Sequence, residues 1–299
     1  MIPTLQAVFP ELSLRQACPL LGISRSGVYA ARQRPAVELD VAAVAVRDAI
    51  ERLVLAFPGY GYRRVTQALR REGWTINAKR VRRVMRDESL LCQLKRRFVR
   101  TTDSRHGLGS YPNRLRERVL GGPNQAWVAD ITYIRLPTTF CSLATVLDAW
   151  SRRVVGWELA RHIDTELTVT ALERAIAGRT PAPGLIHHSD HGVQYASIRY
   201  VARLAAIGAQ IRMAAIGNVY ENALAESFFA TLKREEVYRH DYQSFAEAEG
   251  NLARFLDDVY NHKRLHSSLG YRPPSEFEAC SDDARCLEGS ANLTLTLVH

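Results

Sequence analysis

Cysteine is scarce in this sequence, and its spacing gives no metal or disulfide pattern. The chain has 299 residues and five cysteines, an odd number, and none of them forms a Cys-x-x-Cys pair. This spacing excludes a zinc finger of the usual kind and a disulfide framework. The cysteines are Cys18, Cys92, Cys141, Cys280 and Cys286.

Long apolar runs and a secretory leader are also missing. No uncharged apolar stretch approaches about 18 residues, so we expect no membrane span and no membrane partner. The first residues lack the basic, apolar and small-residue order of a signal peptide, which predicts a cytoplasmic protein. Hydrophobic residues nevertheless make up 46% of the chain, enough to bury a core.

Acidic residues are under-represented in the first part of the chain. Residues 1–120 contain 23 Lys and Arg against 10 Asp and Glu, a net charge of +13, whereas residues 121–299 contain 17 against 21, or −4. A basic region attracts phosphate backbones and releases their condensed counterions. An acidic region with pocketed carboxylates suits an enzyme that uses divalent metal ions.

Helices are expected through the basic region. Residues 1–35 are predicted to contain a small helix–turn–helix, with Ser13 and Ser24 as caps and Gly22 as the break; a mere leader segment is the alternative. Residues 38–97 are predicted to form a basic helical DNA-binding domain. Its helices cover 38–57, a segment from Tyr62 to about Gly73, and a third helix that Asn77 caps.

Basic side chains of this domain are the candidate DNA contacts. In the third helix they lie mostly off the apolar stripe, which is typical of a helix that inserts into DNA or contacts its backbone. An ordinary basic helical bundle is the alternative. The candidates are Arg63, Arg64, Lys79, Arg82, Arg83, Arg86, Lys95, Arg96 and Arg97.

The hydrophobic period changes after a segment rich in Gly and Pro. We place a linker at 98–122, a catalytic core with a helical extension at 123–280, and a tail at 281–299. Three β-rich runs with short turns occupy 126–159 and predict an antiparallel meander. The predicted order βββαβαβα is a mixed α/β layer, the order of the ribonuclease-H-like fold.

Three carboxylates of the core are candidate catalytic residues and metal ligands. Asp130 lies within a β-rich run, where β-propensity disfavours aspartate, Asp190 follows a short strand, and Glu226 lies on a predicted helix. Two Mg²⁺ (or Mn²⁺) ions held by such acids activate water and stabilise a leaving oxygen in phosphodiester chemistry. Asp148 is a competitor, but a turn acid that caps the hairpin or pairs with a neighbouring arginine explains it better.

Lys233 is the expected phosphate-binding residue beside these acids. It follows Glu226 by seven residues, which on a helix is nearly two turns, so both lie on one face. His188 and Asn222 are predicted to support the site by orienting ligands or water.

At these residues the sequence resembles the second-reading-frame catalytic protein of insertion sequences of the IS three family, within the superfamily of DDE transposases and retroviral integrases. One departure is Glu221, where the family usually has Asp. The resemblance rests on Tyr60–Leu90, Trp127–Ile134, His188–Tyr195, Asn218–Phe229, Leu232-Lys233 and Tyr260–Pro274.

The resemblance implies a ribonuclease-H-like integrase core behind a helix–turn–helix region, and a bacterial Mg²⁺-dependent strand transferase that acts on terminal inverted repeats and target DNA. It further implies an oligomer on DNA, association with the nucleoid, and a frameshift fusion to an upstream-frame protein. The chain has no sustained heptad repeat, so we expect that upstream part to be absent. A DNA-binding regulator without catalysis and a nuclease of the same fold are the alternatives.

Overall fold

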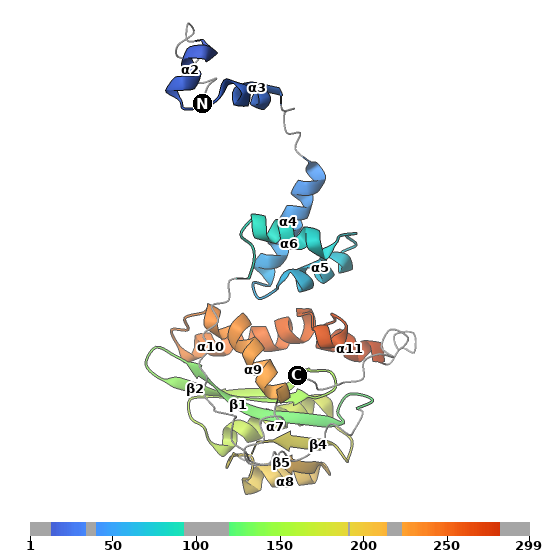
Figure 1. The fold of residues 1–299 in the computed structure, drawn as a ribbon. Coiled ribbons are helices and arrows are strands. Elements are labelled where there is room, and N and C mark those ends of the chain that lie inside the picture. The colour runs from blue at the N-terminus through green and yellow to red at the C-terminus, as the bar shows by residue number, and fades with distance from the viewer. Residues whose placement is uncertain (1–12, 34–39, 93–119, 191, 214–222, 282–299) are drawn as a thin grey trace, which may run out of the picture. The chain divides into compact units, whose positions relative to one another are not determined.

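The computed structural model describes residues 13–33, 40–92, 120–190, 192–213 and 223–281. The contacts within the chain divide it into two compact units, residues 1–52 and 53–299. Figure 1 labels the helices and strands of both. No helix in the described ranges has both the length and the apolar character needed to cross a bilayer.

The first unit contains two short helices where the sequence predicts them. Helix α2 (Leu14–Leu20) follows Ser13, whose backbone N–H donates to the Gln16 side chain at 3.2 Å, and α3 is Arg25–Gln33. Gly22 separates the helices with a φ of +64°, which glycine adopts without strain. The unit also includes most of α4 (Val41–Ala56).

The second unit begins with helices α5 (Tyr62–Arg71) and α6 (Ala78–Asp87). Asn77 caps α6 as expected, because its side chain accepts a hydrogen bond from the Lys79 backbone N–H at 2.8 Å. Each helix has one buried apolar side and one basic exposed side. The buried residues are Val65, Thr66, Leu69, Val81 and Met85.

A five-stranded mixed sheet forms the centre of the core, in the order β3-β2-β1-β4-β5. The first three strands form the predicted antiparallel meander, and β4 and β5 run parallel to β1. This arrangement confirms the expected ribonuclease-H-like order. The strands are β1 (Ala126–Arg135), β2 (Phe140–Asp148), β3 (Val154–Ala160), β4 (Ile186–Ser189) and β5 (Gln210–Met213).

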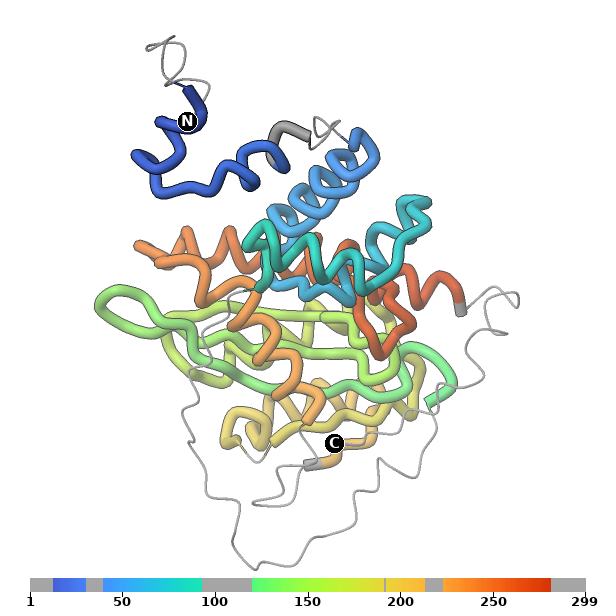
Figure 2. Tube along the Cα trace, turned by 45° about the horizontal axis from the view of Figure 1, so that its top comes forward, coloured from blue at the N-terminus to red at the C-terminus, as the bar shows by residue number. Residues whose placement is uncertain are grey.

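Helices cover both faces of the sheet. Helices α7 (Thr165–Arg179) and α8 (Ile198–Ala206) pack on one face, against a cluster that includes Trp127 and Ala129. Helices α9 (Ala223–Glu235) and α10 (Phe245–Ala253) pack on the other face, against a cluster that includes Val128. Figure 2 shows α9 (orange) crossing the strands of the meander (green). Strand β1 is therefore buried from both sides.

The C-terminal extension begins with a long helix that changes type along its length. Helix α10 ends at Ala253 and continues as a π-helix, η3 (Arg254–Lys263). Asn261 of η3 binds the start of β3, because its amide accepts from the Val154 N–H at 3.0 Å and donates to the Val154 carbonyl at 2.9 Å. Helix α11 (Pro274–Ser281) was not predicted.

Helix α11 is fixed by a buried acid that hydrophobic periodicity cannot reveal. Glu278 accepts hydrogen bonds from Arg153 at 2.7 Å, from Arg179 at 2.6 Å and from the Ser151 hydroxyl at 2.7 Å. Burial raises the pKa of Glu278, but the hydrogen bonds from Arg179, Ser151 and Arg153 outweigh it, so that the pKa lies below the usual value. The acid thus joins α11 to α7 and to the turn after β2.

Candidate active site

The register of β1 and β4 brings two of the candidate acids to neighbouring positions. Val128 pairs with His188 and Ala129 pairs with Ser189 in the parallel ladder; Asp130 is the next residue of β1, and Asp190 directly follows the end of β4. Side chains alternate along a strand, so Asp130 lies on the same sheet face as Val128. That face is the one that α9 covers.

The loop after β4 holds the Asp190 carboxylate through a close backbone contact. The Gly192 N–H donates to Asp190 Oδ1 at 3.0 Å. A Cβ at Gly192 would lie 3.0 Å from that oxygen and 3.1 Å from Gln194 Oε1, closer than most Cβ contacts. The close contact explains the glycine in the sequence Ser-Asp-x-Gly-x-Gln-Tyr, because a residue without a Cβ allows the backbone to approach Asp190.

The pKa of Tyr195, the last residue of this motif, is raised by burial and by the charges of both aspartates. Burial raises its pKa most, and the charges of Tyr200, Asp130 and Asp190 raise it further. The phenol is therefore a neutral group behind the two carboxylates.

The two histidines of β4 have different surroundings. His187 is fully buried and shares a hydrogen bond of 2.9 Å with the Tyr200 hydroxyl. Burial lowers the pKa of His187 to about 3, so the ring is neutral at physiological pH and serves packing. His188, the predicted supporting residue, is also buried, and it pairs with Val128 on the face that α9 covers.

Helix α9 carries the third acid and the predicted phosphate-binding lysine. Glu226 is exposed in the first turn, and partial burial raises its pKa. Lys233 is half-buried; burial lowers its pKa, while the charge of Asp130 raises it. The ammonium of Lys233 is therefore within electrostatic reach of Asp130.

The structure does not gather the three acids into one ligand cluster. Among the described residues, no three His, Cys, Asp or Glu side chains are close enough together to hold a metal ion. The strand register relates Asp130 to Asp190, charge relates Asp130 to Lys233, and Glu226 lies on the same helix as Lys233. Asn222 falls outside the described residues, which resume at Ala223. The roles of these three acids, of Lys233 and of the supporting residues His188 and Asn222 stay predictions.

Asp148 has the structural role that its turn position indicates. It is fully buried, and its carboxylate accepts hydrogen bonds from the backbone N–H groups of Asn124 at 2.6 Å, Trp150 at 3.0 Å and Ser151 at 2.9 Å. The acid caps the turn after β2, and this occupies its oxygens. It pairs with Trp127 in the ladder, well along the strand from Asp130.

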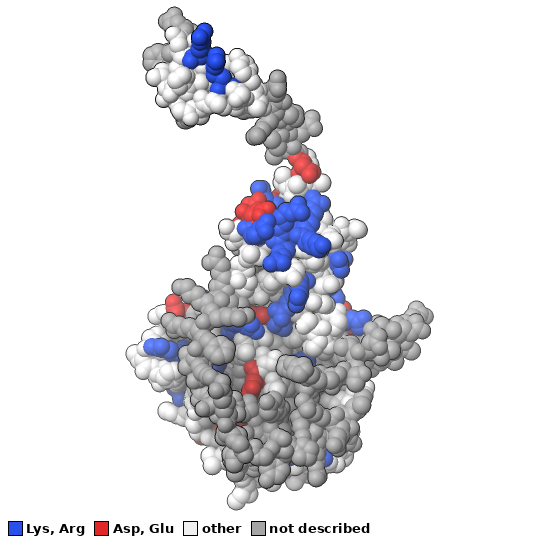
Figure 3. All heavy atoms as spheres, viewed as in Figure 1, with Lys and Arg blue, Asp and Glu red and all other residues white. Residues whose placement is uncertain are grey.

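The candidate DNA contacts have two kinds of environment. Arg63, Lys79, Arg82, Arg83 and Arg86 are exposed, and Figure 3 shows Lys and Arg side chains gathered over the helices α5 and α6. Arg64 differs, because its Nη1 lies 3.1 Å from Glu235 Oε1 of α9 and its side chain is one quarter exposed. Lys95, Arg96 and Arg97 lie outside the described residues, as does nearly all of the predicted linker.

The known protein families that match this chain follow the order of its regions, with a helical family first and core families after it. Residues 42–98 match the HTH-like domain family, and residues 121–219 and 207–274 match two families described as integrase core domain. The transposase InsF of insertion sequence IS3A from Escherichia coli K12 is 33% identical over 274 residues, which cover 90% of this chain and 94% of the relative. The chain belongs to the IS3-family transposases.

Further relatives agree with this assignment. The transposase of insertion sequence element IS904 from Lactococcus lactis is 36% identical over 73% of the chain and 87% of its own length. The IS600 31 kDa protein of Shigella sonnei is 33% identical over 87% of the chain and 96% of its own length. This transposase therefore has a helix–turn–helix-like region and an integrase core. Its family is one of DDE-type polynucleotidyl transferases.

Solved integrases are more distant. A simian T-cell lymphotropic virus intasome in complex with PP2A regulatory subunit B56 gamma has 16% identity and a TM-score of 0.46 over 77% of this chain and 74% of its own. The HTLV-2 integrase catalytic core domain in complex with magnesium has 14% identity and a TM-score of 0.42 over 52% of this chain and 97% of its own.

Proposed function

We propose that this transposase cleaves DNA strands at the ends of its insertion sequence and joins them to target DNA, at a site formed by Asp130, Asp190 and Glu226. The observation that carries the proposal is the parallel pairing of Ala129 with Ser189. It supports a site in which Asp130 of β1 and Asp190, directly after β4, lie close to each other and to the helix that carries Glu226 and Lys233. Acids held on separate rigid elements keep the precise geometry that a catalytic site needs.

The ligand atoms that these acids offer are of the type that magnesium and manganese ions bind. Carboxylate oxygens suit these hard cations, and Mg²⁺ keeps several waters and binds through one or two carboxylates together with substrate phosphates. A site completed by DNA therefore needs no group of three protein ligands in advance. Two such ions, when bound, activate a water or a strand-end hydroxyl and stabilise the leaving oxygen.

The surrounding residues orient the acids and the DNA. The Ile131 N–H donates to Asp130 Oδ1 at 2.7 Å, and Gly192 fixes Asp190, so each carboxylate has a defined direction. Lys233 holds a phosphate of the strand end near Asp130. Glu226 must be ionised to bind a cation, and because burial raises its pKa, it loses that ability at a higher pH than an ordinary glutamate does.

The partners follow from the family and from the charge. The basic helices α5 and α6 bind the terminal inverted repeats, and the core engages the target DNA. The chain acts as a homo-oligomer on DNA, because two ends must be held together. A fusion with an upstream-frame protein supplies further binding to the ends.

The test is cleavage and joining of a labelled duplex that carries the end of the element. Asp130→Asn, Asp190→Asn and Glu226→Gln should each lower both rates by roughly a hundredfold or more, because each removes a metal ligand. Binding of the duplex should persist. Glu173→Gln, an exposed acid of α7, is the matched control.

Two results would contradict the proposal. Wild-type rates in one of the three variants would remove that residue from the site. Cleavage without any joined product, at saturating Mg²⁺ or Mn²⁺, would make the protein a nuclease of the same fold rather than a strand transferase.

A further inference from the structure

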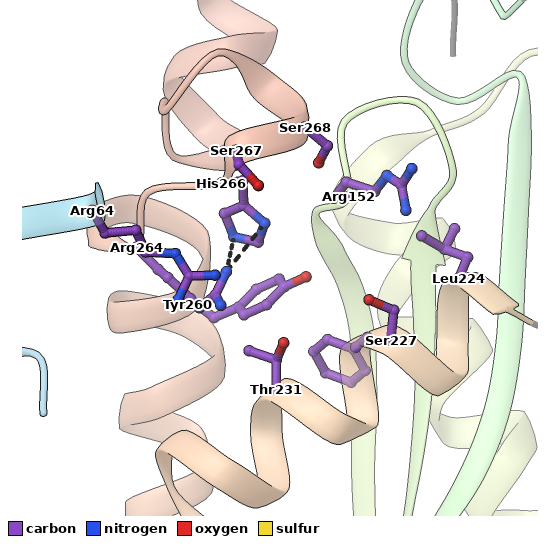
Figure 4. A pocket seen from close by; sticks show the side chains of 11 residues that line it. Arg64, Arg152, Leu224, Ser227, Thr231, Tyr260, Arg264, His266, Ser267 and Ser268 are labelled. Atoms are coloured by element: carbon purple, nitrogen blue, oxygen red, sulfur yellow. Dashed lines mark hydrogen bonds between the residues drawn. The ribbon is translucent and has the colours of Figure 1, made fainter. Parts of the chain in front are cut away.

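A second site lies beside α9, in a pocket of about 110 Å³ that the proposed chemistry does not use. Three arginines from separate elements line it: Arg64 of α5, Arg152 of the turn between β2 and β3, and Arg264 after η3 (Figure 4). Hydroxyl groups of Thr231, Ser267 and other residues complete the wall. The lining thus offers many hydrogen-bond donors around one small space.

The pocket has an excess of positive charge. Glu235 pairs with Arg264 through two contacts of 2.7 and 2.8 Å and with Arg64 at 3.1 Å. In the described part of the chain Glu235 is the ion-pair partner of Arg64 and Arg264, and Arg152 makes no ion pair there, so one negative charge faces three positive charges. His266 is also in the wall, but burial and the arginines lower its pKa to about 2, so that it is neutral.

Arg152 has a fixed backbone and a buried side-chain donor that makes no hydrogen bond in the described part of the chain. Its backbone lies in the left-handed region with a φ of +64°, and its N–H donates to the Asp148 carbonyl at 2.9 Å, which fixes the turn. The Nε atom is buried and has no hydrogen-bond partner among the described residues. A buried donor without a partner costs about 1–3 kcal/mol, so such a group indicates a ligand that would satisfy it.

The pocket is separate from the acids. Successive residues of a helix are about 100° apart, which places Glu226 and Lys233 on one flank of α9. The pocket residues Ser227 and Thr231 lie on the other flank, with the apolar stripe that packs on the sheet between them. A ligand in this pocket would therefore approach the transposase at a point distinct from the metal site.

We propose that this pocket binds a phosphate group of the DNA backbone, held by Arg152, Arg264 and the hydroxyl groups around them. The planar guanidinium group matches the geometry of phosphate oxygens and keeps its charge when buried. A pocket of this volume has room for water molecules or for one phosphate group. Choosing DNA as the source of the phosphate rests on the proposed function, because α5 and α9 both belong to the surfaces predicted to contact DNA.

The experiment measures binding of the full chain to a fluorescent mixed-sequence duplex, without divalent metal, at several salt concentrations. Loss of one phosphate contact should reduce the slope of log K against log salt by about 1. We expect this reduction in Arg152→Gln and in Arg152→Asn, the second of which suits a left-handed backbone. Arg199→Gln, an exposed arginine of α8, removes the same charge and should leave the slope unchanged.

A second variant tests the pocket while leaving all three of its arginines in place. Ser268→Asp, at an exposed position of the pocket rim, should place a carboxylate against the guanidinium groups and weaken duplex binding several-fold. Inorganic phosphate forms the other arm: at constant ionic strength it should raise the Tm of the wild type and not of the Arg152 variants.

The outcomes separate the sources of the phosphate. A phosphate-dependent Tm with unchanged slopes would show a site for free phosphate and overturn the assignment to DNA. Unchanged slopes with no phosphate effect would overturn the site itself. Because binding is measured without metal, these results do not depend on whether the proposed strand transfer occurs.

Discussion

Asp130 illustrates how one residue acquires a function from its strand position. On β1 it is flanked by residues that pack on both faces of the sheet, and its carboxylate accepts a hydrogen bond from the backbone N–H of Ile131. The carboxylate of Asp148, by contrast, accepts hydrogen bonds from backbone N–H groups of its own turn. Two aspartates of one hairpin thus differ, because Asp148 is buried and bound by backbone donors, whereas Asp130 lies in mid-strand within electrostatic reach of Lys233.

The same comparison shows what single residues reveal in a sequence. Asp130 breaks β-propensity and Asp148 follows turn chemistry, so both interpretations depend on local rules and can be made without a structure. Arg152 and Arg264 could not be recognised in this way, because their shared pocket forms only when the turn after β2 meets the segment after η3. The motif Tyr260–Pro274 was the one signal that this segment matters.

Lys233 is predicted to hold a phosphate and not a metal ion, because an ammonium group has no lone pair to donate. Lys233→Ala should slow strand joining by about tenfold or more and leave the Mg²⁺ dependence of the remaining rate unchanged. Lys233→Arg should retain part of the rate, since the charge persists but its point-like geometry does not. The measurement is joining of a labelled terminal duplex across a Mg²⁺ titration.

Arg234→Ala is the matched control for this lysine. Arg234 is the next residue of α9, exposed and on another side of the helix, so its loss should have little effect on joining. Equal rates for Lys233→Ala and the wild type would mean that Lys233 is an ordinary surface lysine.

At the scale of elements, the packing of α7 on the sheet depends on one glycine of β3. A Cβ at Gly156 would lie 2.2 Å from the backbone oxygen of Ala171 and 2.8 Å from the Ala175 Cβ. Backbone cannot move aside as a flexible side chain does, so helix and strand approach this closely only with glycine. Hydrophobic periodicity predicts both elements but not this contact, which explains why the sequence could locate α7 and not its distance from the sheet.

Gly156→Ala should therefore destabilise the protein by about 2–3 kcal/mol, as expected for an overpacked core. Gly178→Ala is a control on the same helix, because a Cβ there meets nothing within 4 Å. Alanine in place of that helical glycine should stabilise the protein by about 0.4–1 kcal/mol. Urea denaturation of both variants measures the difference, and equal midpoints would contradict the close approach of α7 and β3.

At the scale of the whole molecule, contacts within the second unit join the helix–turn–helix-like region to the core. The Leu265 N–H donates to the buried Tyr60 hydroxyl at 2.8 Å, and Arg71 Nη1 lies 3.0 Å from Glu276 of α11. The sequence predicts two regions of opposite charge and places a linker between them, but it gives no sign of these polar contacts. Long-range pairs such as Arg64 and Glu235 follow from the fold and not from any local pattern.

The division of charge nevertheless predicts where DNA affinity resides. The Arg82, Arg83 and Arg86 side chains of α6 are exposed, and each phosphate that they neutralise releases condensed counterions. Changing all three to Gln in the full chain should weaken DNA binding and reduce the slope of log K against log salt by about 3. The measurement is anisotropy of a labelled duplex between about 50 and 200 mM salt.

The control removes the same net charge from the core. Arg135, Arg199 and Arg203 are exposed there, and the last two already face acids of α7, Glu166 and Glu173. Replacing these three by Gln changes the total charge equally, so a purely global attraction would weaken binding as much as the α6 substitutions do. A local contact predicts a large loss for α6 and a small one for the core; equal losses in the two triple variants would mean that α6 is not the helix that binds DNA.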